Sequence, residues 1–139
     1  MFVLPAMARR VAAVRRGAST SLNAGNIDVR RDIGDVRDVV HAYRLLLESL
    51  AEGRLGRAPL VVNVATGRAE PIRSMIDQLC TLAGVSPEVR IDPALVRADD
   101  PPEIRGDATL LGELTGWRPE IPMDVTLRDL LEEAEREGS

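Results

Sequence analysis

Apolar residues recur at helical spacing along most of this chain, so helices are predicted to dominate its structure. The first helix is expected over residues 2–16, because Gly17 follows as a C-cap glycine would. A second helix is expected to begin after the N-cap residue Asp35 and to stop before Gly53. The apolar positions of this second helix are Val36, Val39, Val40, Tyr43, Leu46, Leu47 and Leu50.

Further helices are predicted in the second half of the chain. One is expected to start at Glu70, with Pro71 in its first turn, and to end at Gly84. A short helix is expected after Asp107, which would cap it, and a last helix begins at about Asp124. The inward positions of the last helix are predicted to be Leu127, Leu130, Leu131 and Ala134.

Short extended segments separate these helices. Residues 18–34 contain two glycines and predict two short strands around a turn. The apolar run at 60–65, LVVNVA, is typical of a parallel strand that is covered on both faces, and residues 89–91 predict another short strand. Because helices and strands alternate, the sequence predicts one α/β domain over residues 1–139 with short strands and about five helices.

Composition excludes several classes of function. The net charge is −4 and there are one Phe, one Tyr and one Trp, so neither a basic nucleic-acid surface nor a base-stacking platform is expected. All 18 basic residues are arginine, which excludes any mechanism that needs a lysine of this chain. Cys80 is the single cysteine, so an internal disulfide and a cysteine zinc cluster are excluded, and a buried, inert thiol is expected.

No membrane segment or signal peptide is predicted. The longest apolar runs are too short to span a bilayer. Residues 1–17 carry four arginines but lack the apolar block and cleavage site of a signal peptide. A cytoplasmic protein without a membrane partner is therefore expected.

Candidate catalytic and metal-binding groups are few. His41, the only histidine, is placed on the polar face of the second helix and is interpreted as a surface residue, so no catalytic residue is assigned. The acidic stretch 99–107 lacks the spacing of a calcium loop and is interpreted as a solvated loop, so no metal site is predicted. The stretch 63–67, NVATG, occupies the place of a phosphate loop without its G-x-x-x-x-G-K pattern, and a plain turn is the simpler interpretation.

Two arginines at predicted element ends remain as candidates for anion binding. Arg31 lies between an extended segment and a capped helix, and Arg97 opens an irregular, proline-rich loop. The forked donors of a guanidinium can hold two phosphate oxygens at once. The residues alone thus predict a small α/β domain with a candidate anion site, against the alternative that both are ordinary surface arginines.

Residues 25–43, GNIDVRRDIGDVRDVVHAY, resemble the extended short-chain dehydrogenase/reductases that act on nucleotide sugars, in the NAD-dependent epimerase/dehydratase family. In that family an R-D-[FYW] strand end precedes a helix that begins D-V-x-D, and here Ile33 replaces the aromatic residue. The likeness continues in register along the chain. Residues 1–17 resemble the helix after the family's G-P-G-Q loop, 61–79 its Y-N-V-x-S-G strand and helix, and 97–122 its R-P-x-D-V-P, G-D and G-W-x-P series.

The resemblance is strongest to the GDP-sugar branch, which comprises GDP-mannose 4,6-dehydratases and GDP-4-keto-6-deoxymannose reductases, and the reductases are favoured. It implies that Arg31 and Arg97 contact the ribose and diphosphate of a GDP-hexose. It also implies that Asp100 accepts hydrogen bonds from ribose hydroxyls. Ala98 replaces the family's proline and Pro101 its aliphatic residue, which leaves the shape of this loop open.

The catalytic motifs of the family have no counterpart in the matched segments. Its glycine-rich G-x-x-G-x-x-G turn and its Tyr-x-x-x-Lys pair lie upstream of them, and Tyr43 cannot substitute because Leu47 stands four residues on. The resemblance therefore implies a C-terminal, substrate-binding portion that lacks the NAD(P)-binding half, binds no cofactor itself and is not catalytic alone. The alternative is a remnant or regulatory module that packs against a partner chain. Apolar surface on 60–65 and on the first two helices predicts a homo-oligomer.

Overall fold

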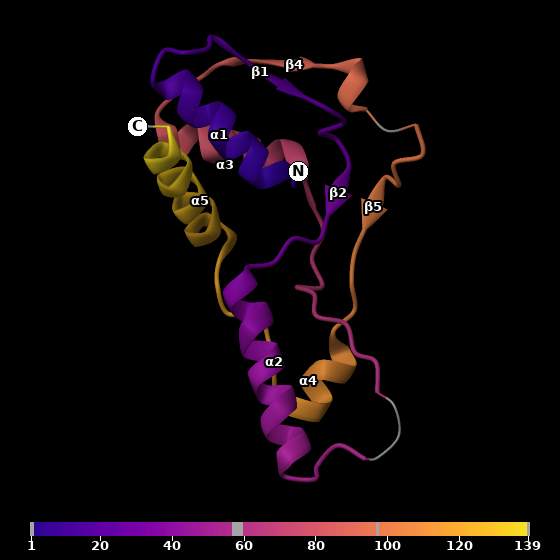
Figure 1. The fold of residues 1–139 in the computed structure, drawn as a ribbon. Coiled ribbons are helices and arrows are strands. Elements are labelled where there is room, and N and C mark those ends of the chain that lie inside the picture. Colours follow the sequence, from indigo (N-terminus) through magenta and orange to yellow (C-terminus); the bar gives the residue numbers. More distant parts are fainter. Residues whose placement is uncertain (1, 57–59, 97, 139) are drawn as a thin grey trace.

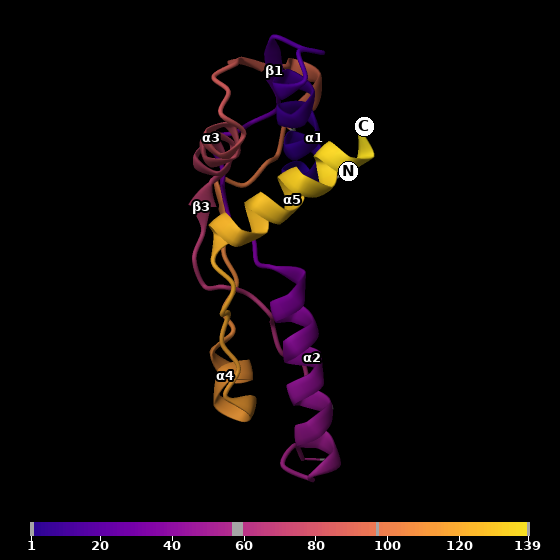
Figure 2. The same cartoon turned by 90° about the vertical axis from the view of Figure 1, so that its left-hand side faces the viewer.

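The computed structural model describes residues 2–56, 60–96 and 98–138. These residues form five α-helices, five short β-strands and one 3-10 helix, which confirms the predicted α/β class. Figures 1 and 2 show α1, α3 and α5 gathered at one end of an elongated molecule and α2 and α4 at the other. Within the described ranges, no helix is long and apolar enough to cross a lipid bilayer.

The larger cluster of buried residues lies where three helices pack together. Helices α1 (Val3–Arg15), α3 (Ile72–Ala83) and α5 (Met123–Glu137) contact one another, and β1 (Ser21–Ala24) pairs in parallel with β4 (Glu88–Ile91) beside them. Periodicity predicted these helices to within a few residues, because each buries one continuous apolar stripe. The fully or nearly fully buried side chains include Met7, Val11, Leu22, Met75, Ile76, Leu79, Leu127, Leu131 and Ala134.

The ends of the helices differ from the predictions in detail. Gly17 and Gly84 follow α1 and α3 with φ of 73° and 68°, as expected for glycines that close helices. Pro71 is the N-cap of α3 rather than a first-turn residue, because it still belongs to a strand. Asp107 precedes the N-cap Ala108 of α4 (Thr109–Thr115), and its Oδ1 accepts a hydrogen bond from the Thr109 amide at 2.9 Å.

A second, smaller cluster joins α2 (Val36–Ala51) to α4. Its buried residues are Ala42, Leu111 and Trp117. The indole Nε1–H of Trp117 donates to the Asp38 carbonyl oxygen at 3.0 Å, so the polar atom of this buried ring is satisfied. The partly buried side chains that complete the cluster are Leu45, Leu46, Val62, Val64 and Ala108.

Most of the apolar stripe on α2 is not covered by the described residues. Val36 is 71% exposed and Leu47 66% exposed, although the sequence pattern is that of a helix packed against a core. The helix contacts α4 through a neighbouring face instead. The exposed members of the stripe follow one another at intervals of four and three residues and form a continuous surface: Val36, Val40, Tyr43, Leu47 and Leu50.

The prediction of a buried parallel strand at 60–65 is wrong. This segment has no regular secondary structure, and Val61 is 87% exposed. A strand requires a neighbouring backbone with which to form hydrogen bonds, and none of the described segments pairs with this one. The apolar run is consequently only partly buried, through the packing of Val62 and Val64 on the second cluster.

A small sheet lies between the two clusters. Strand β2 (Arg30–Arg31) is flanked by β3 (Glu70–Pro71), which is antiparallel to it, and by β5 (Glu103–Ile104), which is parallel. The pairing is extended by the amide of Arg30, which donates to the Pro102 carbonyl at 2.8 Å, and by that of Asp32, which donates to the Ile104 carbonyl at 2.9 Å. Residues distant in the sequence thus meet at β2.

Asp35 connects α2 to α5 directly after this sheet. Its side chain is 3% exposed. Oδ1 accepts hydrogen bonds from the amide and Nε of Arg37, each at 2.8 Å, and Oδ2 accepts from the Thr126 hydroxyl at 2.7 Å. The Arg37 guanidinium holds the pKa of Asp35 well below its usual range, and the Thr126 hydroxyl and the Arg37 amide act in the same direction.

The lowered pKa of Asp35 predicts an acid-sensitive component of stability. A carboxyl whose pKa is depressed by folding stabilises the native state fully above its unfolded-state pKa of about 3.9, and this contribution is lost as the pH falls below that value. Between about pH 5 and about pH 2.5, urea denaturation should show a steeper loss of stability for the wild type than for Asp35→Asn. The exposed Asp124→Asn variant should follow the wild type; parallel curves for Asp35→Asn and wild type would contradict the assignment.

Candidate functional site

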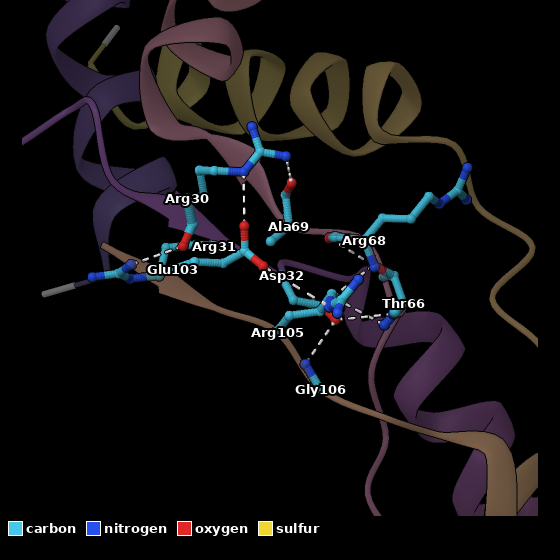
Figure 3. Close-up of polar contacts among 10 residues, drawn as sticks. Arg30, Arg31, Asp32, Thr66, Arg68, Ala69, Glu103, Arg105 and Gly106 are labelled. Carbon is cyan, nitrogen blue, oxygen red and sulfur yellow. Dashed lines mark hydrogen bonds and ion pairs between the residues drawn. The ribbon is translucent and has the colours of Figure 1, made fainter. Parts of the chain in front are cut away.

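The two arginines of β2 reach the segments on either side of the strand. Successive side chains of a strand point to opposite faces, so Arg30 and Arg31 are separated by the sheet. Arg30 Nε donates to Glu103 Oε2 at 2.9 Å, and its Nη2 donates to the Ala69 carbonyl at 2.6 Å (Figure 3). Arg30 therefore links the segments that form β3 and β5 rather than pointing freely into solvent.

Arg31 contacts Asp100, a residue 69 positions later in the sequence. Its Nη2 forms an ion pair with Asp100 Oδ1, and its Nη1 donates to the carbonyls of Pro101 at 2.9 Å and Arg30 at 2.7 Å. The side chains of Arg31 and Asp100 are 17% and 19% exposed, so the pair is mostly desolvated but still open to solvent. Arg97, the third predicted site residue, lies outside the described residues.

Pro101 and Pro102 do not prevent the segment that contains Asp100 from pairing with β2. A proline lacks the N–H donor but keeps its carbonyl acceptor. The Pro101 carbonyl accepts from the Arg31 guanidinium, and the Pro102 carbonyl accepts from the Arg30 amide. The replacement of the family's aliphatic residue by Pro101 is thus compatible with a carboxylate of Asp100 against Arg31.

The side chain of Asp32, next to Arg31, accepts four hydrogen bonds. Its Oδ1 accepts from the amide and hydroxyl of Thr66, at 3.0 and 2.6 Å. Its Oδ2 accepts from the amides of Gly67 and Gly106, at 2.9 and 3.2 Å (Figure 3). One carboxylate therefore ties the end of β2 to the 66–67 turn and to the segment after β5.

Gly106 allows these segments to approach one another. A Cβ atom at this position would lie 2.3 Å from Cβ of Ala65, a distance that no side chain tolerates. The glycine lets the backbone of Gly106 come within hydrogen-bonding distance of Asp32. The G-D dipeptide at 106–107 thus has a local structural role, since Asp107 binds the first amide of α4.

Asp38, three residues after Asp35, also binds the backbone of a distant segment. It is 5% exposed, and its Oδ2 accepts from the amides of Glu120 and Ile121 at 3.2 and 3.1 Å. Asp32, Asp35 and Asp38 follow at intervals of three residues, and each binds a different distant segment. Their common spacing in RDIGDVRD was the available signal, but from the sequence only Asp35 was assigned a role, as a helix cap.

The remaining segments that the sequence offered as candidate binding or reactive sites form contacts within the chain or are partly buried. The NVATG turn does bind an anion, but that anion is the carboxylate of Asp32 in the same chain. In the acidic stretch, Asp100 and Glu103 pair with the arginines of β2, so this stretch is not simply solvated. The described residues contain no group of three or more His, Cys, Asp or Glu side chains placed to hold a metal. Burial raises the pKa of the partly buried Cys80 thiol.

Two cavities flank the aspartates. One of about 330 Å³ is bounded by Asp35, Thr66, Arg68 and the start of α5. Another of about 230 Å³ is bounded by Asp32, Asp38 and Trp117. Arg31 and Asp100 form part of neither wall, so their ion pair is accessible from the surface rather than enclosed in these cavities.

Comparison with known proteins gives a consistent result. Residues 1–130 match the sequence model of a family described as GDP-mannose 4,6 dehydratase. The chain is 38% identical over 135 residues to GDP-6-deoxy-D-mannose reductase of Pseudomonas aeruginosa, and the alignment covers 96% of this chain and 42% of the relative. It is 26% identical over 134 residues to GDP-mannose 4,6 dehydratase 1 of Arabidopsis thaliana, and this alignment covers 95% of this chain and 35% of the relative.

Solved structures agree with these relatives. RMD from Pseudomonas aeruginosa complexed with NADPH matches with a TM-score of 0.86 and 36% identity, over 98% of this chain and 43% of that protein. A putative epimerase from Burkholderia cenocepacia matches with a TM-score of 0.80 and 32% identity, over 97% and 41%. The chain spans less than half the length of these proteins, and it has the fold of their C-terminal part.

The connections of Asp32 predict a large effect of a small substitution. Asp32→Asn keeps the size of the side chain but presents an NH₂ group to amides that need an acceptor. Hydrogen bonds to charged groups contribute roughly 1.5–3 kcal/mol each. The two amides that donate to Oδ2, those of Gly67 and Gly106, lose their acceptor, so urea denaturation should show a loss of about 3–6 kcal/mol in the free energy of unfolding. The matched variant Asp28→Asn removes only an exposed ion pair with Arg73 and should cost less than about 1 kcal/mol. Similar losses for both variants would contradict the anchoring role.

Proposed function

This chain belongs to the GDP-mannose 4,6-dehydratase family, and we propose that it is the nucleotide-sugar-binding portion of a GDP-hexose 4-keto reductase or 4,6-dehydratase. The observation that carries the proposal is the convergence of Arg31 and Asp100 beside β2 in a chain of this family. Identity of 38% to a GDP-6-deoxy-D-mannose reductase, against 26% to a dehydratase, favours the reductase. A cytoplasmic location is part of the same proposal.

The proposed roles of the two side chains follow from their chemistry. A guanidinium forms short, charge-assisted hydrogen bonds with phosphate oxygens, so Arg31 would bind the diphosphate of the nucleotide. A carboxylate accepts hydrogen bonds from hydroxyls, so Asp100 would bind the ribose. Arg97 stays a predicted second cation, as part of the same proposal.

Chemistry and cofactor binding are proposed to reside in the part of the relatives that this chain does not span. The sequence has no lysine for a Tyr-x-x-x-Lys pair. NADPH is bound by the related RMD of Pseudomonas aeruginosa. Among the described residues, the turn that most resembles a phosphate loop is filled by the carboxylate of Asp32, which would repel a cofactor phosphate. This turn therefore does not fit a cofactor phosphate, and no catalytic step is assigned to its residues.

The exposed stripe of α2 favours a second candidate function, that of a module that packs against another protein surface. Its five apolar residues lie on one face of the helix, and Leu60 and Val61 are exposed as well. Apolar patches of this kind promote association. The proposed occupant for this chain by itself is a second copy; in a longer protein, the cofactor-binding part would take that place.

Binding of GDP tests the first proposal. At a GDP concentration ten times the dissociation constant, the ligand adds about 1.4 kcal/mol of stability, or roughly 4 °C in Tm. Differential scanning fluorimetry should show this rise for the wild type and for Arg44→Ala, whose arginine pairs with Glu48 on the exposed side of α2. Arg31→Ala should abolish it and Arg31→Lys should reduce it, in protein shown to be folded by circular dichroism. No rise in the wild type at millimolar GDP would leave the module as the better account.

The oligomeric state tests the second candidate. Light scattering on the chain should give a dimer or a larger assembly, because burial of the α2 stripe removes apolar surface from water. Leu47→Arg should shift the chain toward monomer, whereas Ile91→Arg, which places the same charge at another exposed apolar position on β4, should not. A monodisperse wild-type monomer would count against association through this surface.

A further inference from the structure

The guanidinium of Arg31 already holds an anion of its own chain. Its Nη2 is paired with Asp100, and its Nη1 donates to two backbone carbonyls. Of its five N–H donors, these contacts use three, and the carboxylate takes the place that an oxygen of a bound phosphate would occupy. An anionic ligand that takes the Nη2 donor now paired with Asp100 displaces that carboxylate.

We propose that Asp100 is a specificity-determining residue, which holds Arg31 in the free protein and passes to the ribose hydroxyls when a nucleoside diphosphate binds. This inference rests on the proposed function, because that assigns the diphosphate to Arg31 and the ribose to Asp100. The inference adds an exchange of partners to the proposed function. The Asp100 carboxylate loses its hydrogen bond from the Arg31 guanidinium and accepts hydrogen bonds from the two ribose hydroxyls instead. The site is thereby selective for ligands that carry both groups.

The selectivity follows from the surroundings of the carboxylate. At 19% exposure, an unpaired Asp100 is only partly hydrated, so leaving it without donors is unfavourable. Ribose hydroxyls supply new donors. Inorganic pyrophosphate has no ribose hydroxyls and adds negative charge next to the displaced carboxylate. Simple anions are therefore rejected although Arg31 suits them, and a nucleoside diphosphate is accepted.

The backbone allows Asp100 to move without disturbing β2. The carbonyls of the two residues that follow it are fixed by Arg31 and by the amide of Arg30. Asp100 itself lies in an irregular segment between the 3-10 helix η1 (Pro93–Leu95) and β5. In the proposed exchange the side chain of Asp100 rotates while the main chain stays in place.

The test compares two ligands on two variants by isothermal titration calorimetry. Asp100→Asn weakens the contact to Arg31 and should bind pyrophosphate about five-fold more tightly than the wild type, as expected for a partly exposed ion pair of about 1 kcal/mol. It should bind GDP no more tightly than the wild type does, since the ribose loses a charged acceptor. Asp99→Asn removes the same charge from the exposed neighbouring residue and should leave the ratio of the two affinities unchanged. Asp100→Ser serves if Asp100→Asn does not fold.

Each alternative outcome has a distinct meaning. Pyrophosphate affinity that does not rise in either Asp100 variant, with GDP binding intact in the wild type, overturns the exchange but not nucleotide binding. Equal tightening of GDP and pyrophosphate, or the same gain in Asp99→Asn, shows a general charge effect and also overturns it. A wild-type chain that binds no GDP overturns the proposed function together with this inference.

Discussion

The carboxylate of Asp32 is the interaction on which the arrangement of the site depends. Strand β2 has only two residues, and its neighbours are equally short, so backbone pairing alone provides few hydrogen bonds. Asp32 adds four, from the 66–67 turn and from Gly106. Buried or half-buried amides that lack a partner in regular structure must find one elsewhere, and a fixed carboxylate meets that need for both segments at once.

Asp35 and Asp38 extend the same principle from the sheet to the helices. Asp35 links the start of α2 to α5, and Asp38 binds the segment that leads into α5. The two hydrophobic clusters are thus joined chiefly through a small sheet and through the carboxylates of Asp32, Asp35 and Asp38. Figure 1 shows β2 and β5 between the two groups of helices. This construction leaves one face of α2 uncovered in the described part of the chain, which fits a protein portion that packs against something further.

Sequence reasoning succeeded where structure is determined locally. The helices at 72–83 and 123–137 follow from the periodicity of their apolar residues, and their stripes are buried as expected. It failed at 60–65, because the same apolar run is a strand only when a neighbouring strand is present. The exposed stripe of α2 agrees with the apolar surface that was expected on the second helix. Apolar spacing indicates a face that suits packing, but it does not indicate which surface covers that face.

The site shows a similar division. Arg31 and Asp100 are 69 positions apart, and only the family resemblance suggested that they act together. Asp32 and Asp38 were assigned no role from the sequence, because hydrogen bonds to distant amides leave no local pattern. Nothing in composition or spacing indicated that Arg31 would be occupied by Asp100, since that contact depends on the pairing of β2 with the segment after the proline-rich loop.

A crystal structure of the chain with GDP tests the central claim, that Arg31 and Asp100 form a nucleotide site, most directly. The account predicts a diphosphate oxygen within hydrogen-bonding distance of the Arg31 guanidinium and the ribose hydroxyls against Asp100, with the contacts of Asp32 unchanged. A nucleotide bound away from β2, with Asp100 still paired to Arg31, would contradict it.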